Sequence, residues 1–300
     1  MMNISQPTVS ISCITYNHAA YIRKCLDGFI MQETTFSFEV LIHDDASTDG
    51  TEQIIREYEQ KYPNIIKPIY EKENQWRKGI GGSAVFNFPR AKGKYIAMCE
   101  GDDYWTDSLK LQKQVEMMEM HNNCALCFHA TKCVRASDTD IVYNIISKSQ
   151  QRFNIHDLIL GGGGFMATNS MLFKSEFVRN IPQWMLDCPV GDLPLMLLVG
   201  CGGDIFYIND IMSAYRVGAG GYTSIVGQNF LKTSKHYKGI FRMFDGFDEW
   251  SKMNYHDTVL LRKKQLRKQY YKELVMCFMK KFLGENFYFK VHSIYREHKK

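Results

Sequence analysis

The sequence predicts an α/β fold: a mainly parallel, doubly wound sheet with helices on both faces, followed by a helical C-terminal extension. Two observations support this prediction. In the first 120 residues, short apolar stretches alternate with segments whose apolar residues recur at helical spacing. Each apolar stretch leads into a polar turn or a helix, an order that is typical of parallel strands joined by crossovers.

Four strands are expected in the first part of the chain. They are expected at residues 9–14, 38–43, 65–70 and 95–99. Helices are expected at residues 19–31, between residue 51 and Pro63, at 83–90 and at 108–120. Asp49 and Glu52 resemble a capping box at the start of the second helix, and Pro63 ends that helix.

The second half of the chain is less regular. Strands are expected at residues 125–131, 141–145, 170–174 and 205–208, and a helix at 193–199. Residues 161–164 are expected to form a loop, and residues 214–224 form a second glycine-rich segment. From about residue 230 the pattern is helical.

Positive charge is concentrated near the C-terminus. The formal net charge is +5, but residues 262–300 contain 12 Lys or Arg and 3 Asp or Glu, a local charge of +9. The first 261 residues therefore carry about −4. Because this basic segment is also rich in aromatic residues, it fits helices at a membrane surface better than nucleic-acid binding. The alternative is a helical cap packed on the core, with a solvated basic face.

The sequence favours a cytoplasmic protein. No apolar run reaches the roughly 18 to 20 residues of a membrane-spanning helix. Residues 1–8 lack the basic and apolar regions of a signal peptide. The nine cysteines lie mostly in apolar stretches, where reduced thiols pack as small hydrophobes. A location at the inner face of the membrane is expected if the basic segment binds lipid.

Polar clusters follow three of the expected strands, at the edge where parallel α/β sheets bind ligands. They are Thr15-Tyr16-Asn17, Asp44-Asp45 and Glu100-Gly101-Asp102-Asp103. The last cluster places three carboxylates in four residues, a repulsion that a bound cation relieves. Mg2+ and Mn2+ prefer oxygen ligands and bind phosphates, so Asp102 and Asp103 are candidate ligands of a metal that carries a diphosphate. Asp44 and Asp45 are candidate partners of a nucleotide's base or ribose.

Asp192 lies at the start of an expected helix, after a loop that contains Pro189. A carboxylate at this position is either a helix cap, which spacing alone favours, or a general base. Residues 79–84 match a Gly-x-Gly-x-x-Ala dinucleotide fingerprint, but that fingerprint requires a preceding strand. The polar residues 75–78 stand there instead, which argues against dinucleotide binding.

Several of these segments, in this order, resemble family 2 glycosyltransferases of the GT-A fold. The resemblance rests on residues 9–17, on Asp-Asp-Ala-Ser-Thr-Asp-Gly-Thr at 44–51, and on Gly-Lys-Tyr-Ile at 93–96 leading to Glu-Gly-Asp-Asp-Tyr-Trp at 100–105. It covers roughly residues 7–224. It implies a catalytic domain at 1–228, with a nucleotide-binding half at 1–120 and an acceptor half at 121–228. A basic helical extension then occupies residues 229–300.

The resemblance implies an inverting, metal-dependent transferase. The donor would be a nucleotide-diphospho-sugar, most often UDP-linked, and the acceptor a hydroxyl of a glycan or lipid-linked molecule in cell-surface polysaccharide biosynthesis. By position, Thr15, Tyr16 and Asn17 flank the nucleotide, Asp45 or Asp44 contacts the base, Asp102 and Asp103 bind ribose and Mn2+ or Mg2+, Asp192 is the catalytic base, and Arg216 lies near the diphosphate. Glu100 replaces the Asp with which the family's motif usually begins.

Two other functions fit parts of the sequence. A metal-dependent nucleotidyltransferase that makes a nucleotide-sugar also uses carboxylates and a metal on an α/β sheet. It requires a basic phosphate-binding segment after the first strand, where Tyr16-Asn17-His18 stands. A membrane-surface binding module fits residues 262–300, and it is compatible with the transferase.

Overall fold

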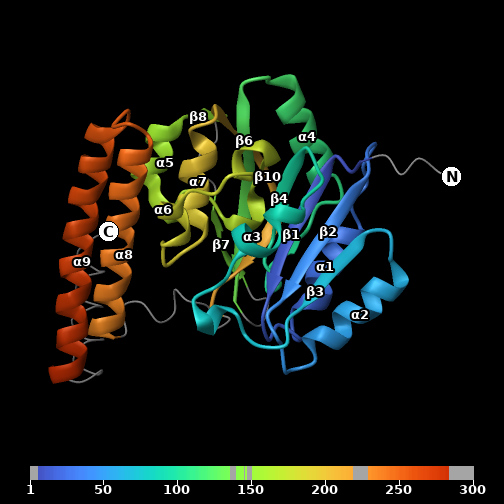
Figure 1. Cartoon of the computed structure of the whole chain (residues 1–300), viewed down its shortest axis with the longest axis horizontal. Helices are drawn as coiled ribbons and strands as arrows, with labels where there is room; N and C mark the ends of the chain where they lie inside the picture. Colours follow the sequence, from blue (N-terminus) through green and yellow to red (C-terminus); the bar gives the residue numbers. More distant parts are fainter. Residues whose placement is uncertain (1–5, 136–139, 145, 147–150, 219–228, 284–300) are drawn as a thin grey trace. The chain divides into compact units, whose positions relative to one another are not determined.

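The computed structural model describes residues 6–135, 140–144, 146, 151–218 and 229–283. The chain divides into two compact units (Figure 1). The first contains residues 1–186 and 190–219, and the second contains residues 187–189 and 220–300. The functional division at residue 228 stays a prediction.

The first unit is built on a ten-stranded sheet, in which eight strands follow the order β3-β2-β1-β4-β9-β6-β10-β5. The bounds of these strands are β1 Val9–Thr15, β2 Phe38–Asp44, β3 Ile66–Tyr70, β4 Tyr95–Met98, β5 Tyr104–Trp105, β6 Cys124–Val134, β9 Leu172–Lys174 and β10 Asp204–Arg216. Strands β3, β2, β1 and β4 are parallel, whereas β9 is antiparallel to both β4 and β6. β7 (Asp140–Asn144) pairs with β6, and β8 (Arg152–Phe153) pairs with β10.

Helices cover both faces of the parallel part of the sheet, as the sequence predicts. The helices are α1 Ile22–Ile30, α2 Thr51–Lys61, α3 Ser83–Phe86, α4 Lys110–Met120, α5 Ile155–Gly161, α6 Gln183–Leu186 and α7 Asp192–Gly200. Ile11 and Cys13 of β1 belong to one buried cluster with residues of α1, α2 and α4. Ser12 points to the opposite face, because side chains alternate along a strand, and its hydroxyl donates to Ser83 Oγ of α3 at 2.9 Å.

Three local predictions are wrong. Residues 161–164 are not a loop, because Gly161 ends α5 and Gly162–Gly164 form a short 3-10 helix. Asp49 and Glu52 form no capping box, because Gly50 is the N-cap of α2 with a left-handed φ of 102°. Asp49 instead accepts hydrogen bonds from the backbone N–H groups of Ala19 and Thr51. The strand expected at residues 205–208 extends to Arg216, so the first three residues of the glycine-rich segment 214–224 belong to β10.

The second unit contains an antiparallel pair of helices, α8 (Phe230–Trp250) and α9 (His256–Leu283), which lie side by side (Figure 1). Asn229 caps α8 by accepting from the N–H groups of Leu231 and Lys232. Tyr237 on α8 donates to Glu273 Oε1 on α9 at 2.9 Å. In the described part of the chain, no helix has the length and apolar character required to cross a membrane.

Candidate functional site

The turns after β1 and β2 are joined by hydrogen bonds. Asn17 has a positive φ of 53°, which turns its backbone so that its N–H donates to Ser47 Oγ at 2.8 Å. The Asn17 side-chain oxygen accepts from Thr48 N–H at 2.8 Å. Two polar clusters that the sequence placed at separate strand ends are therefore adjacent, as expected for neighbouring parallel strands.

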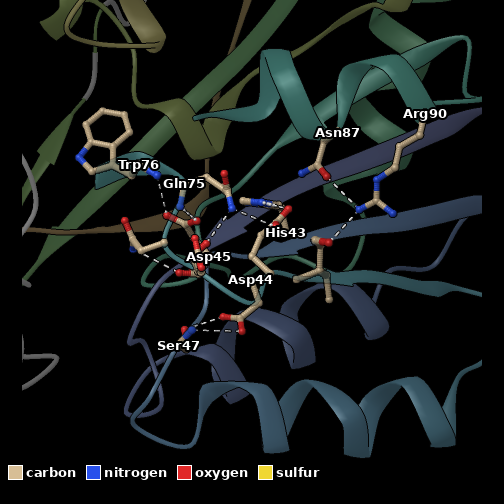
Figure 2. A network of polar contacts seen from close by, with 12 residues as sticks. His43, Asp44, Asp45, Ser47, Gln75, Trp76, Asn87 and Arg90 are labelled. Carbon is tan, nitrogen blue, oxygen red and sulfur yellow. Dashed lines mark hydrogen bonds and ion pairs between the residues drawn. The ribbon is translucent and has the colours of Figure 1, made fainter. Parts of the chain in front are cut away.

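Asp44 and Asp45 lie in different environments. Asp44 is completely buried and accepts a 2.5 Å hydrogen bond from Ser47 Oγ, and burial raises the pKa of its carboxyl group. Asp45 accepts from the backbone N–H of Gln75 at 2.6 Å and of Trp76 at 3.2 Å (Figure 2). Asp44 thus stabilises its own turn, whereas Asp45 fixes the loop that follows β3.

Figure 2 shows further polar contacts beside this loop, around His43, Asn87 and Arg90. His43 stacks on Phe86 with ring centroids 3.8 Å apart, and its Nε2 lies 3.4 Å from Glu71 Oε1. Arg90 donates to Asn87 Oδ1 at 2.9 Å and to the carbonyl of Ile42 at 2.8 Å. The strand end that carries Asp45 is consequently fixed by side chains of α3 and the turn after it.

The Glu100–Asp103 segment approaches the β1 turn through Gly101. Its N–H donates to the carbonyl of Ile14 at 3.0 Å. A Cβ atom at Gly101 would lie 2.5 Å from Thr15 Oγ1 and 3.0 Å from His18 Nδ1, so only glycine fits between them. Thr15 and His18 therefore lie directly against the backbone of the carboxylate segment.

Arg216 connects β10 to two of the carboxylate residues. Its backbone N–H donates to Asp103 Oδ1 at 2.7 Å, and its Nε donates to the Asp102 carbonyl at 2.9 Å. The guanidinium carbon lies 4.3 Å from the centre of the Tyr21 ring, a cation–π arrangement. Arg216 thereby places a fixed positive charge beside the carboxylates.

Asp103 is a buried carboxylate. It is 1% exposed, and its Oδ2 atom has no hydrogen-bond partner in the described part of the chain. Burial, together with the charges of Asp102 and Glu100, holds the pKa of Asp103 well above its usual range. An acidic oxygen in this position gains from a bound cation or from a proton.

Asp192 lies near enough to the carboxylate segment to act on it through its charge. Burial, followed by the charges of Asp102 and Asp192, raises the pKa of Glu100 to about 8. The pKa of Tyr215 is also raised, first by burial and then by the charges of Asp103, Glu100, Asp102 and Asp192. Asp192 is the first residue of α7, and its Oδ1 accepts from the N–H of Leu193 at 2.8 Å. Burial raises the pKa of Asp192 as well.

The donor set fits a divalent cation that shares its coordination with a ligand. Among the residues that the structure describes, no three His, Cys, Asp or Glu side chains are arranged to hold a metal by themselves. Mg2+ commonly uses only one or two carboxylates and completes its shell with water and substrate phosphates. Asp102 and Asp103 can supply these two carboxylates, and Oδ2 of Asp103 has no hydrogen-bond partner within the described ranges of the chain.

Two residues at the site were not among the candidates from sequence. His18 borders Thr15, and its pKa is lowered mainly by burial, while the charges of Asp102 and Asp49 act in the opposite direction. Tyr21 supplies the ring beneath Arg216. The available signal for His18 was its position directly after Asn17. The contact between Tyr21 and Arg216 depends on the path of β10.

Residues 10–178 match the family model described as glycosyl transferase family 2. The chain belongs to this family. An uncharacterized protein of Mycobacterium bovis is 38% identical over 217 residues, which are 69% of this chain and 58% of that protein. The putative teichuronic acid biosynthesis glycosyltransferase TuaG of Bacillus subtilis is 36% identical over 123 residues, 41% of this chain and 46% of TuaG. The chain thus spans 58% of the length of the mycobacterial relative.

Solved structures of GT-A glycosyltransferases share the fold. Residues 1–349 of S. aureus TarS in complex with UDP-GlcNAc superpose with a TM-score of 0.59 at 17% identity, over 80% of this chain and 66% of TarS. The mannosyltransferase PcManGT of Pyrobaculum calidifontis, in complex with GDP-Man and Mn2+, gives a TM-score of 0.58 at 17% identity, over 90% of this chain and 73% of PcManGT. The predicted α/β fold of the GT-A type is therefore confirmed.

Proposed function

We propose that this protein transfers a sugar from a nucleotide-diphospho-sugar to a hydroxyl group of a glycan or lipid-linked acceptor, with inversion at the anomeric carbon. The observation that carries the proposal is the grouping of Glu100, Asp102 and Asp103 beside the fixed guanidinium of Arg216, with Asp192 near enough for its charge to raise the pKa of Glu100. Family membership supports sugar transfer. The name of TuaG supports a role in cell-surface polysaccharide biosynthesis.

The donor binds at the ends of β1 and β2 in this proposal. Thr15, Tyr16 and Asn17 flank the nucleotide, and Asp45 contacts the base. Of the two neighbouring aspartates, Asp45 is favoured as the base partner because it is 7% exposed, whereas Asp44 is completely buried and bonded to Ser47. A UDP-linked donor is favoured by the likeness to TarS, whose structures contain UDP and UDP-GlcNAc.

Asp102 and Asp103 would hold Mn2+ or Mg2+, and the neighbouring ribose would contact Asp102. A divalent cation bound there neutralises the diphosphate and stabilises it as a leaving group. Arg216 adds a second positive charge close to the same carboxylates, and its contacts to Asp102 and Tyr21 prevent it from swinging away. PcManGT, whose structure contains Mn2+ and GDP-Man, supports a metal-dependent reaction.

Asp192 acts as the general base. Its carboxylate takes the proton from the acceptor hydroxyl while that oxygen forms a bond to C1 of the sugar and the bond from C1 to the diphosphate oxygen breaks. Burial raises the pKa of Asp192, which strengthens it as a base relative to an exposed aspartate. A cytoplasmic location, and contact of residues 262–300 with the inner face of the membrane, complete the proposal.

Product analysis tests the proposal. The chain is incubated with UDP-sugars and an acceptor preparation, with Mn2+ or with EDTA. Sugar transfer predicts release of UDP that depends on Mn2+, whereas a nucleotidyltransferase releases or consumes pyrophosphate. Pyrophosphate chemistry without UDP release would contradict the proposed function.

A further inference from the structure

One face of α9 is exposed along most of its length and carries large apolar side chains together with cations. Leu260, Tyr271, Val275 and Phe278 are 49%, 64%, 57% and 57% exposed. Their spacing puts them in one line along a helix of 3.6 residues per turn, with the exposed Lys264 and Arg267 between them. We call these residues the α9 stripe: Leu260, Lys264, Arg267, Tyr271, Val275 and Phe278.

The other face of α9 packs on α8. Val259, Leu266 and Cys277 are buried. Tyr270 and Ser234 share a hydrogen bond of 2.9 Å between their hydroxyl groups, and the rings of Tyr237 and Tyr270 lie 5.1 Å apart. These contacts with α8 are made by the other face of α9, while the apolar side chains of the α9 stripe are about half exposed or more in the described part of the chain.

Helix α9 carries many more basic than acidic residues. Residues 256–283 contain eight Lys or Arg and two acidic residues, Asp257 and Glu273, a formal charge of +6. Glu273 accepts from Tyr237 and so faces α8. The exposed Asp257 lies one turn before Leu260 on the same line, and no acidic residue follows it there as far as Phe278. A surface that pairs apolar contact with cations in this way complements anionic headgroups above an apolar layer.

We propose that the α9 stripe docks the second unit onto an anionic phospholipid surface. Tyr271, Val275 and Phe278 enter the boundary between headgroups and acyl chains, while Lys264 and Arg267 pair with lipid phosphates. The inference deepens the proposed function and rests on it for its purpose, because a lipid-linked acceptor is presented at such a surface. The docking itself depends only on α9.

Vesicle flotation of the full chain tests the proposal. The probes are vesicles of phosphatidylcholine alone and vesicles that also contain about one third phosphatidylglycerol. The wild-type chain is expected to float with the anionic vesicles and much less with the neutral ones. Lys264→Gln with Arg267→Gln is expected to weaken binding about 30-fold, since each cation near an anionic surface contributes a factor of about five. Tyr271→Ser with Phe278→Ser, which leaves the charge unchanged, is also expected to reduce flotation strongly.

Lys61→Gln with Lys92→Gln is the matched control, because both side chains are exposed in the first unit and the change in net charge is the same. This control is expected to float like wild type. Wild-type chain that stays in solution, or equal loss in the control, would overturn the proposal. Sedimentation velocity supplies a further test. If wild type is a dimer and the stripe variants are monomers with unchanged flotation, the stripe joins two copies of the chain, and the proposal is overturned. The stripe variants are expected to bind UDP in solution as wild type does. A wild-type chain that fails to bind UDP would count against the proposed function and not against membrane docking.

Discussion

The backbone N–H of Arg216 donates to Asp103 Oδ1 at 2.7 Å across 113 residues of sequence. This hydrogen bond joins the last residue of β10 to the carboxylate segment that follows β4. Because Arg216 Nε also binds the Asp102 carbonyl, the positive guanidinium is fixed beside the carboxylates before any ligand arrives. The site is therefore built by strand pairing as much as by the motif itself.

Asp103→Ala is expected to lower the free energy of unfolding by about 1 to 3 kcal/mol, because it leaves the buried Arg216 N–H without its acceptor. Asp103→Asn keeps an acceptor of the same shape and is expected to retain most of the stability. Urea denaturation measures both. Asp210→Ala, which breaks an exposed ion pair with Lys113, is the control and is expected to change stability by less than about 1 kcal/mol. Equal destabilisation by Ala and Asn at position 103 would contradict this role.

Gly101→Ala is expected to destabilise the protein by about 1 to 3 kcal/mol, since its Cβ would lie 2.5 Å from Thr15 Oγ1. The turn after β1 must shift to admit the methyl group, so UDP binding is expected to weaken as well. Thermal unfolding and calorimetric titration measure the two effects. Gly164→Ala is the control, because a Cβ there meets no atom within 4 Å. A Gly101→Ala protein as stable as this control would show that the close approach does not matter.

Glu100 predicts a pH dependence of stability. Its pKa is raised to about 8 in the folded chain, against about 4.3 for an ordinary Glu. Between these values the folded state keeps a proton that the unfolded state has lost, so stability falls as pH rises through this window. Glu100→Gln removes that loss. In EDTA it is expected to be more stable than wild type at pH 8 and similar at pH 4. The difference at pH 8 is expected to be on the order of 2 kcal/mol, because Glu100 is largely but not completely removed from solvent. Parallel curves at all pH values would refute the burial of a protonated Glu100.

Asp102→Ala is expected to remove the Mn2+-dependent part of UDP binding, a loss of about tenfold or more, because it deletes a proposed metal ligand. Isothermal titration with UDP, in Mn2+ and in EDTA, measures this part. Glu116→Ala removes an exposed carboxylate on α4 and should leave both affinities unchanged. If Asp102→Ala binds UDP with an undiminished Mn2+ effect, the metal is held elsewhere.

The parallel half of the sheet was predictable from sequence because its strands are continuous apolar runs that end in polar turns. The positions where these strands end could be predicted for the same reason. The parallel arrangement of β1 and β2 then brings Asn17 and Ser47 into contact. The full extent of β10 was not predictable. Asn209 and Asp210 interrupt its apolar pattern, and the structure accommodates them with register shifts against β6 between Ile208 and Ser213.

The site could be predicted in part. The Asp-Asp and Glu-Gly-Asp-Asp segments carry local signals, whereas the position of Asp192 depends on how α7 packs in the folded chain. Spacing alone favoured a helix cap at Asp192, and its carboxylate does accept from Leu193 N–H. Only the electrostatic proximity of Glu100 and Asp192 in the structure adds it to the carboxylate cluster.

The most direct test of the account is the turnover of Asp192→Asn with a UDP-sugar, Mn2+ and acceptor, measured with UDP binding on the same protein. Loss of the general base is expected to lower the rate of sugar transfer by about 10²- to 10⁴-fold, while the affinity for UDP stays within about twofold of wild type. Full turnover by Asp192→Asn would contradict the assignment of the base and, with it, the proposed mechanism.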